Sequence, residues 1–471
     1  MTFRCTAALL MGCWGLCTVL FAQPDTLTVS NISIEGNKKT FPQVILREMT
    51  FKAGDKLSFQ GLEDLLFTNQ QNIYNLGIFT RVEVVPEIAD RTISVTVSVQ
   101  ERWYIFVFPH AVLEERNTYD IFQNRNLRRL SYGLTMDWAN FTGRNDKLVV
   151  WGQLGFSQRF NATFSRPAIF PKPNIDLITS FDYINEKELI YGTETGIVQW
   201  GRTDQNALQR SYVGKLAFRK RFSPRKSLLL QLSYQDFTFD DSIYVFSERF
   251  VPTANGREFY PGLLLALVND QRDIRSFPLN GFRYQVFFRQ AGFPGNFTSR
   301  FAKIGATWAH HISLSEKWNF AYGFHHILTF GKELPFFEKS FIGLKNGDFP
   351  GISYNLRGYQ PYAIDGSYVQ MTKAEWKYAL FPRQMVHADW VPFKRFQDFP
   401  FGVYLTAYTD VAYVSDQTIS NFDNTFKDRW LTGFGVGLNI IGIYDNLLRL
   451  EYSWNHLQEG GFFLHGSVSI R

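Results

Sequence analysis

Cysteine is nearly missing from this 471-residue chain: Cys5, Cys13 and Cys17 are its three copies, and all fall near the start. They lie inside an expected export signal, so the mature chain is expected to contain no thiol. A thiol-free chain excludes disulfides and thiolate metal sites as sources of stability or chemistry.

Long apolar runs, clustered charge and nucleotide-binding glycine patterns are missing as well. No run of about 18 apolar residues follows the signal, so no helix is expected to span a bilayer. The formal net charge is +6 and the pI about 9.0, but Lys and Arg are scattered, which predicts no nucleic-acid partner. Walker, dinucleotide and G-x-S-x-G patterns do not occur, so we expect no enzyme, cofactor or metal site.

The first 22 residues have the pattern of a secretory signal peptide. Arg4 supplies the positive n-region, the stretch AALLMGCWGLCTVLF the apolar h-region, and Ala22 the small residue for cleavage. A short transmembrane anchor is the alternative interpretation. The letters LMGC before Cys13 loosely resemble a lipoprotein cleavage site, but cleavage there would leave the apolar WGLCTVLF exposed.

Aromatic residues are abundant, at 17% of the chain with 47 Phe, although the mean hydropathy is only −0.17. This combination is typical of a membrane β-barrel, in which alternate residues face lipid and aromatic girdles lie at both interfaces. Segments of alternating apolar and polar residues continue from Trp103 to the end. A soluble sandwich alternates in the same way, but it rarely needs so many aromatics or strands of this length.

Counting these segments predicts the strand number. About 16 or 17 are present, and closed single-chain bacterial barrels have even numbers, so we predict 16 antiparallel strands over residues 103–471. The ambiguous segment is LIYGTETGIVQW, which fits a long surface hairpin. The predicted fold class is therefore an all-β transmembrane β-barrel behind a small N-terminal α+β domain.

Residues 27–101 differ from the rest of the chain, because they include apolar residues at helical spacing. Their pattern predicts the order strand, helix, helix, strand, strand. Thr40 and Pro42 suit the start of the first helix, and Gly77 suits the end of the second. This order, and the phrase YNLGIFTRVEV in particular, resembles a POTRA domain, a periplasmic module that binds polypeptide. A generic α+β module would produce the same pattern.

Three pieces of the barrel region strengthen a family resemblance. They are NDQRDIRSFPLNGFR at 269–283, LRGY at 356–359, and the segments KAEWKYALF and YLTAYTDVAYV. Together with the N-terminal module they resemble the BamA/TamA superfamily of outer-membrane barrels, which includes two-partner secretion translocators. The first piece is interpreted as a strand end and a periplasmic turn, through the following residues: Asp270, Arg272, Asp273, Pro278 and Gly281.

The Arg-Gly-Tyr sequence is the most specific part of this resemblance. Alternation turns Glu375 and Asp410 toward the lumen, because an acid on the lipid face is costly. The resemblance implies that the loop carrying Arg357 folds inward and that its guanidinium meets both carboxylates. Gly358 would allow close backbone approach, and Tyr359 would pack on the wall. The alternative is that Arg357 is a solvated loop residue.

The resemblance implies a function without chemical catalysis in the bacterial outer membrane, with the N-terminal domain in the periplasm. The first hypothesis is an assembly and insertion factor that captures unfolded outer-membrane polypeptides and inserts them at the barrel seam. A secretion pore for polypeptides and a passive or structural barrel are the alternatives. Lipids and accessory periplasmic or lipoprotein subunits are the other implied partners. Gly460 and Gly461 would loosen the last strand at the seam; the alternative is that they serve an ordinary bend.

Overall fold

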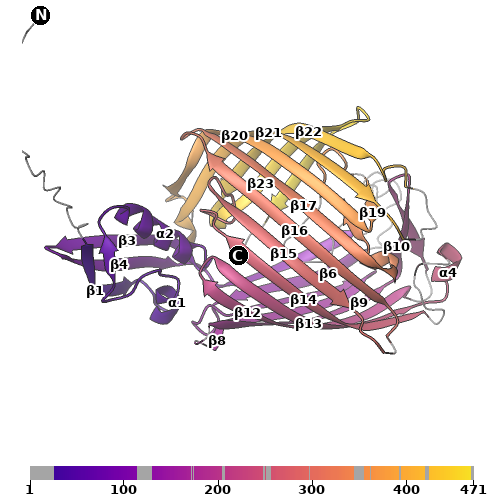
Figure 1. Cartoon of the computed structure of the whole chain (residues 1–471), viewed down its shortest axis with the longest axis horizontal. Helices are drawn as coiled ribbons and strands as arrows, with labels where there is room; N and C mark the ends of the chain where they lie inside the picture. The colour runs from indigo at the N-terminus through magenta and orange to yellow at the C-terminus, as the bar shows by residue number, and fades with distance from the viewer. Residues whose placement is uncertain are drawn as a thin grey trace, which may run out of the picture.

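The computed structural model describes residues 26–467, except 114–129, 171, 173, 204–206, 248–249, 251–255, 296, 344–354, 361, 392–393 and 419–423. The expected signal peptide and its three cysteines lie outside the described residues. Figure 1 shows a small N-terminal domain set against one end of a barrel, which we call the domain end; the opposite end is the far end.

The N-terminal domain is a four-stranded sheet with helices. Its elements are β1 (Thr26–Glu35), α1 (Pro42–Leu46), β2 (Lys56–Ser58), α2 (Leu62–Tyr74), β3 (Phe79–Ala89) and β4 (Thr92–Glu101). The sheet order is β2-β1-β4-β3, with β1 parallel to β4. Apolar residues of both helices, such as Ile45 and Ile73, are buried with Ile93 and Val97 of the sheet. The predicted order is confirmed, apart from the three-residue strand β2.

Thr40 does not cap α1, so that prediction is wrong. The N-cap residue is Phe41, which makes no side-chain cap, and Pro42 lies in the first turn as predicted. The Thr40 hydroxyl instead donates to the Glu101 carboxylate at 2.7 Å, which also accepts the Thr40 backbone N–H. The charged Glu101 carboxylate is a stronger acceptor than a neutral group, and its bonds with Thr40 tie the start of α1 to the end of β4.

The barrel is one sheet of sixteen strands, which confirms the predicted fold class. The strands are β5 (Ile105–Leu113), β6 (Leu130–Ala139), β7 (Lys147–Gly155), β8 (Gln158–Phe170), β9 (Ile175–Glu186), β12 (Gln209–Ser223), β13 (Lys226–Phe239), β14 (Arg257–Asp270), β15 (Gly281–Ala291), β16 (Arg300–Ser313), β17 (Trp318–Glu333), β20 (Tyr368–His387), β21 (Asp398–Ser415), β22 (Trp430–Gly442), β23 (Asn446–Asn455) and β24 (Gly460–Ser467). The ambiguous segment forms a separate hairpin, β10 (Glu188–Glu194) with β11 (Ile197–Arg202).

The two ends of the barrel differ in their connections. At the domain end, some connections are tight turns, such as residues 224–225. Others are somewhat longer and contain α5 (Lys394–Gln397) or η3 (Ile443–Asp445). At the far end lie the β10–β11 hairpin and α4 (Ile243–Phe246), as Figure 1 shows, and the long β17–β20 connection. That connection contains η2 (Phe336–Glu338), β18 (Ser340–Ile342) and β19 (Ile364–Gly366).

Loop residues fill the far half of the lumen with an apolar core. Tyr359 and Phe426 from two long connections pack in one buried cluster with Met371, Val414 and Leu431 from the far ends of wall strands. The outer wall is apolar as well: Trp376 is 47% exposed, whereas its inward neighbour Lys377 is buried. Among the described residues, no helix is long and apolar enough to cross a membrane.

Candidate functional site

Arg357 lies inside the barrel, bound to two carboxylates of the wall. Its Nε and Nη2 donate to the Asp410 oxygens Oδ2 and Oδ1 at 2.9 and 2.6 Å, and its Nη1 donates to Glu375 Oε2 at 2.6 Å. Its backbone N–H also reaches Asp410, at 3.2 Å. The planar guanidinium engages Asp410 with two parallel bonds, an arrangement that a lysine cannot reproduce. We call these three residues the Arg357 centre.

Strand alternation explains why both acids face inward. Glu375 on β20 and Asp410 on β21 lie on antiparallel neighbours, with Lys373 directly opposite Asp410. Trp376 follows Glu375 and points outward, so the next residue on each side of it faces the lumen. Asp410 has no exposed surface. A carboxylate buried to this degree requires a cation with hydrogen bonds, which Arg357 supplies.

An aromatic face completes the centre and was not predicted. The Arg357 guanidinium carbon lies 3.7 Å from the centre of the Tyr408 ring, close enough for a cation–π contact. The Tyr408 hydroxyl bonds the Ser453 hydroxyl at 2.6 Å, which links β21 to β23. The signal in the sequence was the position of Tyr408 two residues before Asp410, on the same face of the strand.

Gly358 and Tyr359 fix the loop beside the centre. Gly358 has φ +87°, and a Cβ there would lie 2.4 Å from the carbonyl oxygen of Trp454. The carbonyl of Gly358 accepts a bond from the Asn455 side chain at 3.1 Å. Tyr359 is 1% exposed and hydrogen bonds with His456. Three consecutive residues therefore hold the loop against β20, β21 and the far end of β23.

The turn predicted from NDQRDIRSFPLNG lies at the domain end. Two carboxylates within this segment, those of Asp270 and Asp273, accept hydrogen bonds from other residues of the same segment. Asp270, the last residue of β14, accepts two bonds from Arg272 at 2.7 and 2.8 Å. The Asp273 carboxylate accepts the backbone N–H groups of Ile274 and Leu279 at 2.7 and 3.2 Å. Burial raises the pKa of Asp273, although these bonds oppose the shift. We call residues 271–280 the lumenal turn.

The lumenal turn also reaches the Arg357 centre, which sequence reasoning missed. Phe277 is buried, and the ammonium of Lys377 lies 4.6 Å from the centre of its ring. Lys377 donates to the Pro278 carbonyl at 3.1 Å and lies 3.7 Å from Glu375. Gly281 ends the turn with φ +96°. The two sequence motifs thus meet inside one lumen through Lys377.

A second cluster of buried charges holds the far end together. Lys339 lies 3.2 Å from Asp365 and 2.6 Å from Asp416, and Lys427 lies 2.9 and 3.2 Å from the same two carboxylates. Burial disfavours the Asp416 carboxylate, but the two lysines outweigh it and lower its pKa. These residues come from two separate connections, β17–β20 and β21–β22, so no spacing in the sequence predicted the cluster.

Gly460 and Gly461 begin β24, the last strand. They pair with Trp454 and Ser453 of β23 at the far end of the wall. Over the described parts of both strands, no backbone pairing joins β24 to β5. Phe462, on β24, has 86% of its surface exposed. Over their described residues, the first and last strands therefore each leave one edge without a backbone partner.

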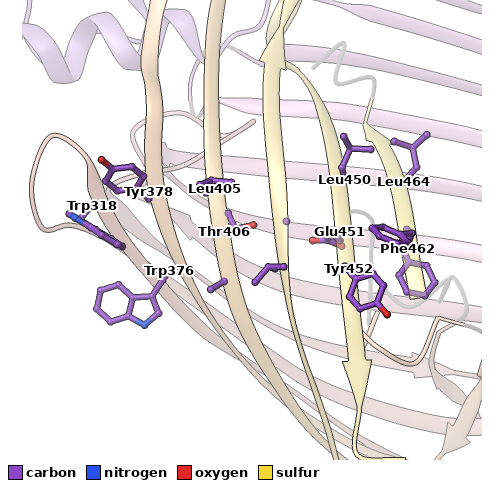
Figure 2. A pocket seen from close by; sticks show the side chains of 14 residues that line it. Trp318, Trp376, Tyr378, Leu405, Thr406, Leu450, Glu451, Tyr452, Phe462 and Leu464 are labelled. Atoms are coloured by element: carbon purple, nitrogen blue, oxygen red, sulfur yellow. The ribbon is translucent and has the colours of Figure 1, made fainter. Parts of the chain in front are cut away.

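A hollow marks the outer wall beside this seam. It has a volume of about 680 Å³ and extends from β17 to β24. Figure 2 shows Trp318, Trp376 and Tyr378 at one side of the hollow, and Tyr452 and Phe462 at the other. Smaller residues, such as Leu405, Ala407 and Val436, lie between them, so the outer surface is recessed next to the last strand.

Comparisons with known proteins agree with this architecture. The Omp85 superfamily domain matches residues 140–458, and a POTRA family model, described as a surface antigen variable number repeat, matches residues 27–102. No curated protein matches by sequence. The solved structure of CdiB from Escherichia coli aligns with a TM-score of 0.53 at 12% identity, covering 94% of this chain and 74% of that chain.

BamA from Haemophilus ducreyi, solved without POTRA domains 1–3, aligns with a TM-score of 0.49 at 18% identity, over 94% of this chain and 84% of that one. The resemblance to the BamA/TamA superfamily is confirmed by the family match, which spans most of the barrel and follows one POTRA domain. The chain belongs to the Omp85 superfamily of outer-membrane β-barrels, whose members act in insertion or translocation.

Proposed function

We propose that this protein assembles other outer-membrane proteins by inserting their strands at the seam between β5 and β24. The observation that carries the proposal is the missing backbone ladder between these two strands over their described residues. An unpaired edge presents a row of N–H and C=O groups, which is a template for an incoming strand.

Two features of the wall support insertion at that place. Gly460 and Gly461 give the start of β24 no side chain to pack. The hollow of Figure 2 is lined in part by β24, so lipid next to the seam meets a recessed surface. Both features lower the cost of separating the seam and admitting a client strand.

The N-terminal domain is proposed to lie in the periplasm and to capture clients before insertion. β3 is the outer strand of its sheet, and over its described residues β3 pairs with β4 alone. A client segment can add to that edge through backbone hydrogen bonds, which tolerate many sequences. Client folding and insertion supply the free energy, and no step requires catalysis by a side chain.

The filled lumen argues against the passive channel. The cluster around Tyr359 and Phe426 occupies the far half of the lumen. The Arg357 centre and Phe277 lie closer to the domain end. A secretion pore would require the Arg357 loop to move, because the loop and the cluster around Tyr359 lie inside the lumen through which an extended chain would pass. Insertion requires the seam to open and does not require a chain to pass through the lumen.

Reconstitution in liposomes tests the proposal. The full chain is inserted into vesicles, a urea-unfolded eight-stranded barrel is added, and its folding is followed by the heat-modifiable shift on a gel. The proposal predicts faster client folding than in empty vesicles, without leakage of a small entrapped dye. Unchanged client folding would refute insertion, and transfer of an unfolded polypeptide into the vesicle would favour the secretion pore.

A further inference from the structure

The N-terminal domain is hydrogen bonded to the lumenal turn through the side chain of Asn75. Asn75, at the C-terminal end of α2, donates from Nδ2 to the carbonyl of Asp273 at 2.9 Å. Its Oδ1 accepts the backbone N–H of Arg275 at 3.3 Å. The amide thereby binds a donor and an acceptor of the same turn, as a paired strand would. A movement of α2 must move this segment or break both bonds.

The segment that Asn75 binds, residues 273–275, continues directly into the lumen. Two residues after Arg275, Phe277 packs against Tyr404 with ring centres 4.8 Å apart. This contact belongs to a buried cluster that includes Ala379 of β20 and Ile441 of β22. The turn is therefore held at both ends, by the N-terminal domain outside the barrel and by the wall inside it.

Lys377 joins the turn to the Arg357 centre. Its ammonium donates to the Pro278 carbonyl at 3.1 Å and lies 3.7 Å from Glu375, whose other oxygen accepts the bond from Arg357. Lys377 is buried, so its charge depends on these partners. If Pro278 withdraws, Lys377 loses an acceptor and moves toward Glu375, where it competes with Arg357 for the carboxylate.

We propose that the lumenal turn is a coupling element, through which displacement of the N-terminal domain releases the loop that carries Arg357. The inference rests on the proposed function, since client capture is the event that displaces the domain. Asn75 and Lys377 are positioning residues in this scheme, and the path of contacts runs from α2 through Pro278 and Glu375 to Arg357.

The test uses a cysteine at Leu356, which is buried beside Arg357. Leu356→Cys is placed in a full-length chain whose three N-terminal cysteines are replaced, and the protein is reconstituted in vesicles. The labelling rate with a small thiol reagent reports how often the loop leaves the wall. Asn75→Ala is expected to raise that rate about 5-fold or more. The increase is expected to vanish when Lys377→Met is already present.

Tyr74→Phe is the matched control. Tyr74 is the neighbouring residue on α2 and bonds Asp445 at 2.6 Å and Arg383 at 3.0 Å, neither of which belongs to the lumenal turn. It should leave labelling unchanged. Equal rates in Asn75→Ala and the parent, or equal increases in Asn75→Ala and Tyr74→Phe, would overturn the proposal. No client enters the assay, so its failure is separate from a failure of insertion.

Discussion

Replacing Arg357 by alanine should release its loop while the sixteen strands stay paired. The substitution removes three charged hydrogen bonds and leaves Asp410 fully buried without its cation. Removing one partner of a buried ion pair costs about 3–5 kcal/mol. Lys373 lies opposite Asp410 and takes up part of the charge, so we expect the lower end of that range. About 3 kcal/mol corresponds to a roughly 100-fold shift in loop docking.

The assay is thiol labelling of Leu356→Cys, with the heat-modifiable gel shift as the check that the barrel remains folded. Arg357→Lys keeps the charge but loses the bidentate geometry, and should fall between the parent and Arg357→Ala. The double variant Arg357→Gln with Asp410→Asn removes both charges, and should label more slowly than Arg357→Ala. If Arg357→Ala labels as slowly as the parent, apolar contacts of Tyr359 hold the loop and the reasoning fails.

Three further predictions concern the loop and the far end. Gly358→Ala should undock the loop by about 1–3 kcal/mol, because its φ is positive and a Cβ would strike the carbonyl of Trp454; faster labelling of the same reporter checks this. Acid should destabilise the packing of the far-end loops, because the pKa of Asp416 is lowered in the folded protein. The stability that Asp416 contributes is complete above its unfolded pKa of about 3.9, and it is lost as the pH falls through the lower folded pKa. Proteolysis of the external loops across that range measures the effect. Lys427→Met should make those loops more sensitive to protease already at neutral pH, whereas unchanged cleavage would show that Lys339 alone suffices.

The barrel strands and the inward position of the two acids were predictable because each depends on local rules. Alternation fixes which face of a strand meets lipid, so the inward phase of Glu375 and Asp410 followed from their apolar neighbours. Gly358 could be placed because a positive φ favours glycine. The family resemblance supplied the remaining step, that the loop of Arg357 folds inward. No local pattern contained that step.

The missed features depend on contacts between distant segments. Thr40 fits a helix cap by its position, but Glu101 is 61 residues away and offers a charged acceptor. Phe277 looked like part of an ordinary turn, since nothing near it in the sequence shows that Lys377 lies above its ring. Asn75 looked like the end of a helix. Their roles follow from how the domain meets the barrel, which periodicity does not encode.

A disulfide across the seam tests the central claim most directly. One cysteine is placed at Phe106 on β5 and the other is scanned over residues 463–467 of β24, so that a pair with suitable geometry is found. Client folding in vesicles is then measured with and without oxidant, with each single cysteine as a control. Insertion at the seam predicts that crosslinking stops client folding while the barrel stays intact and reduction restores it. Client folding at the same rate with the seam closed would contradict the account.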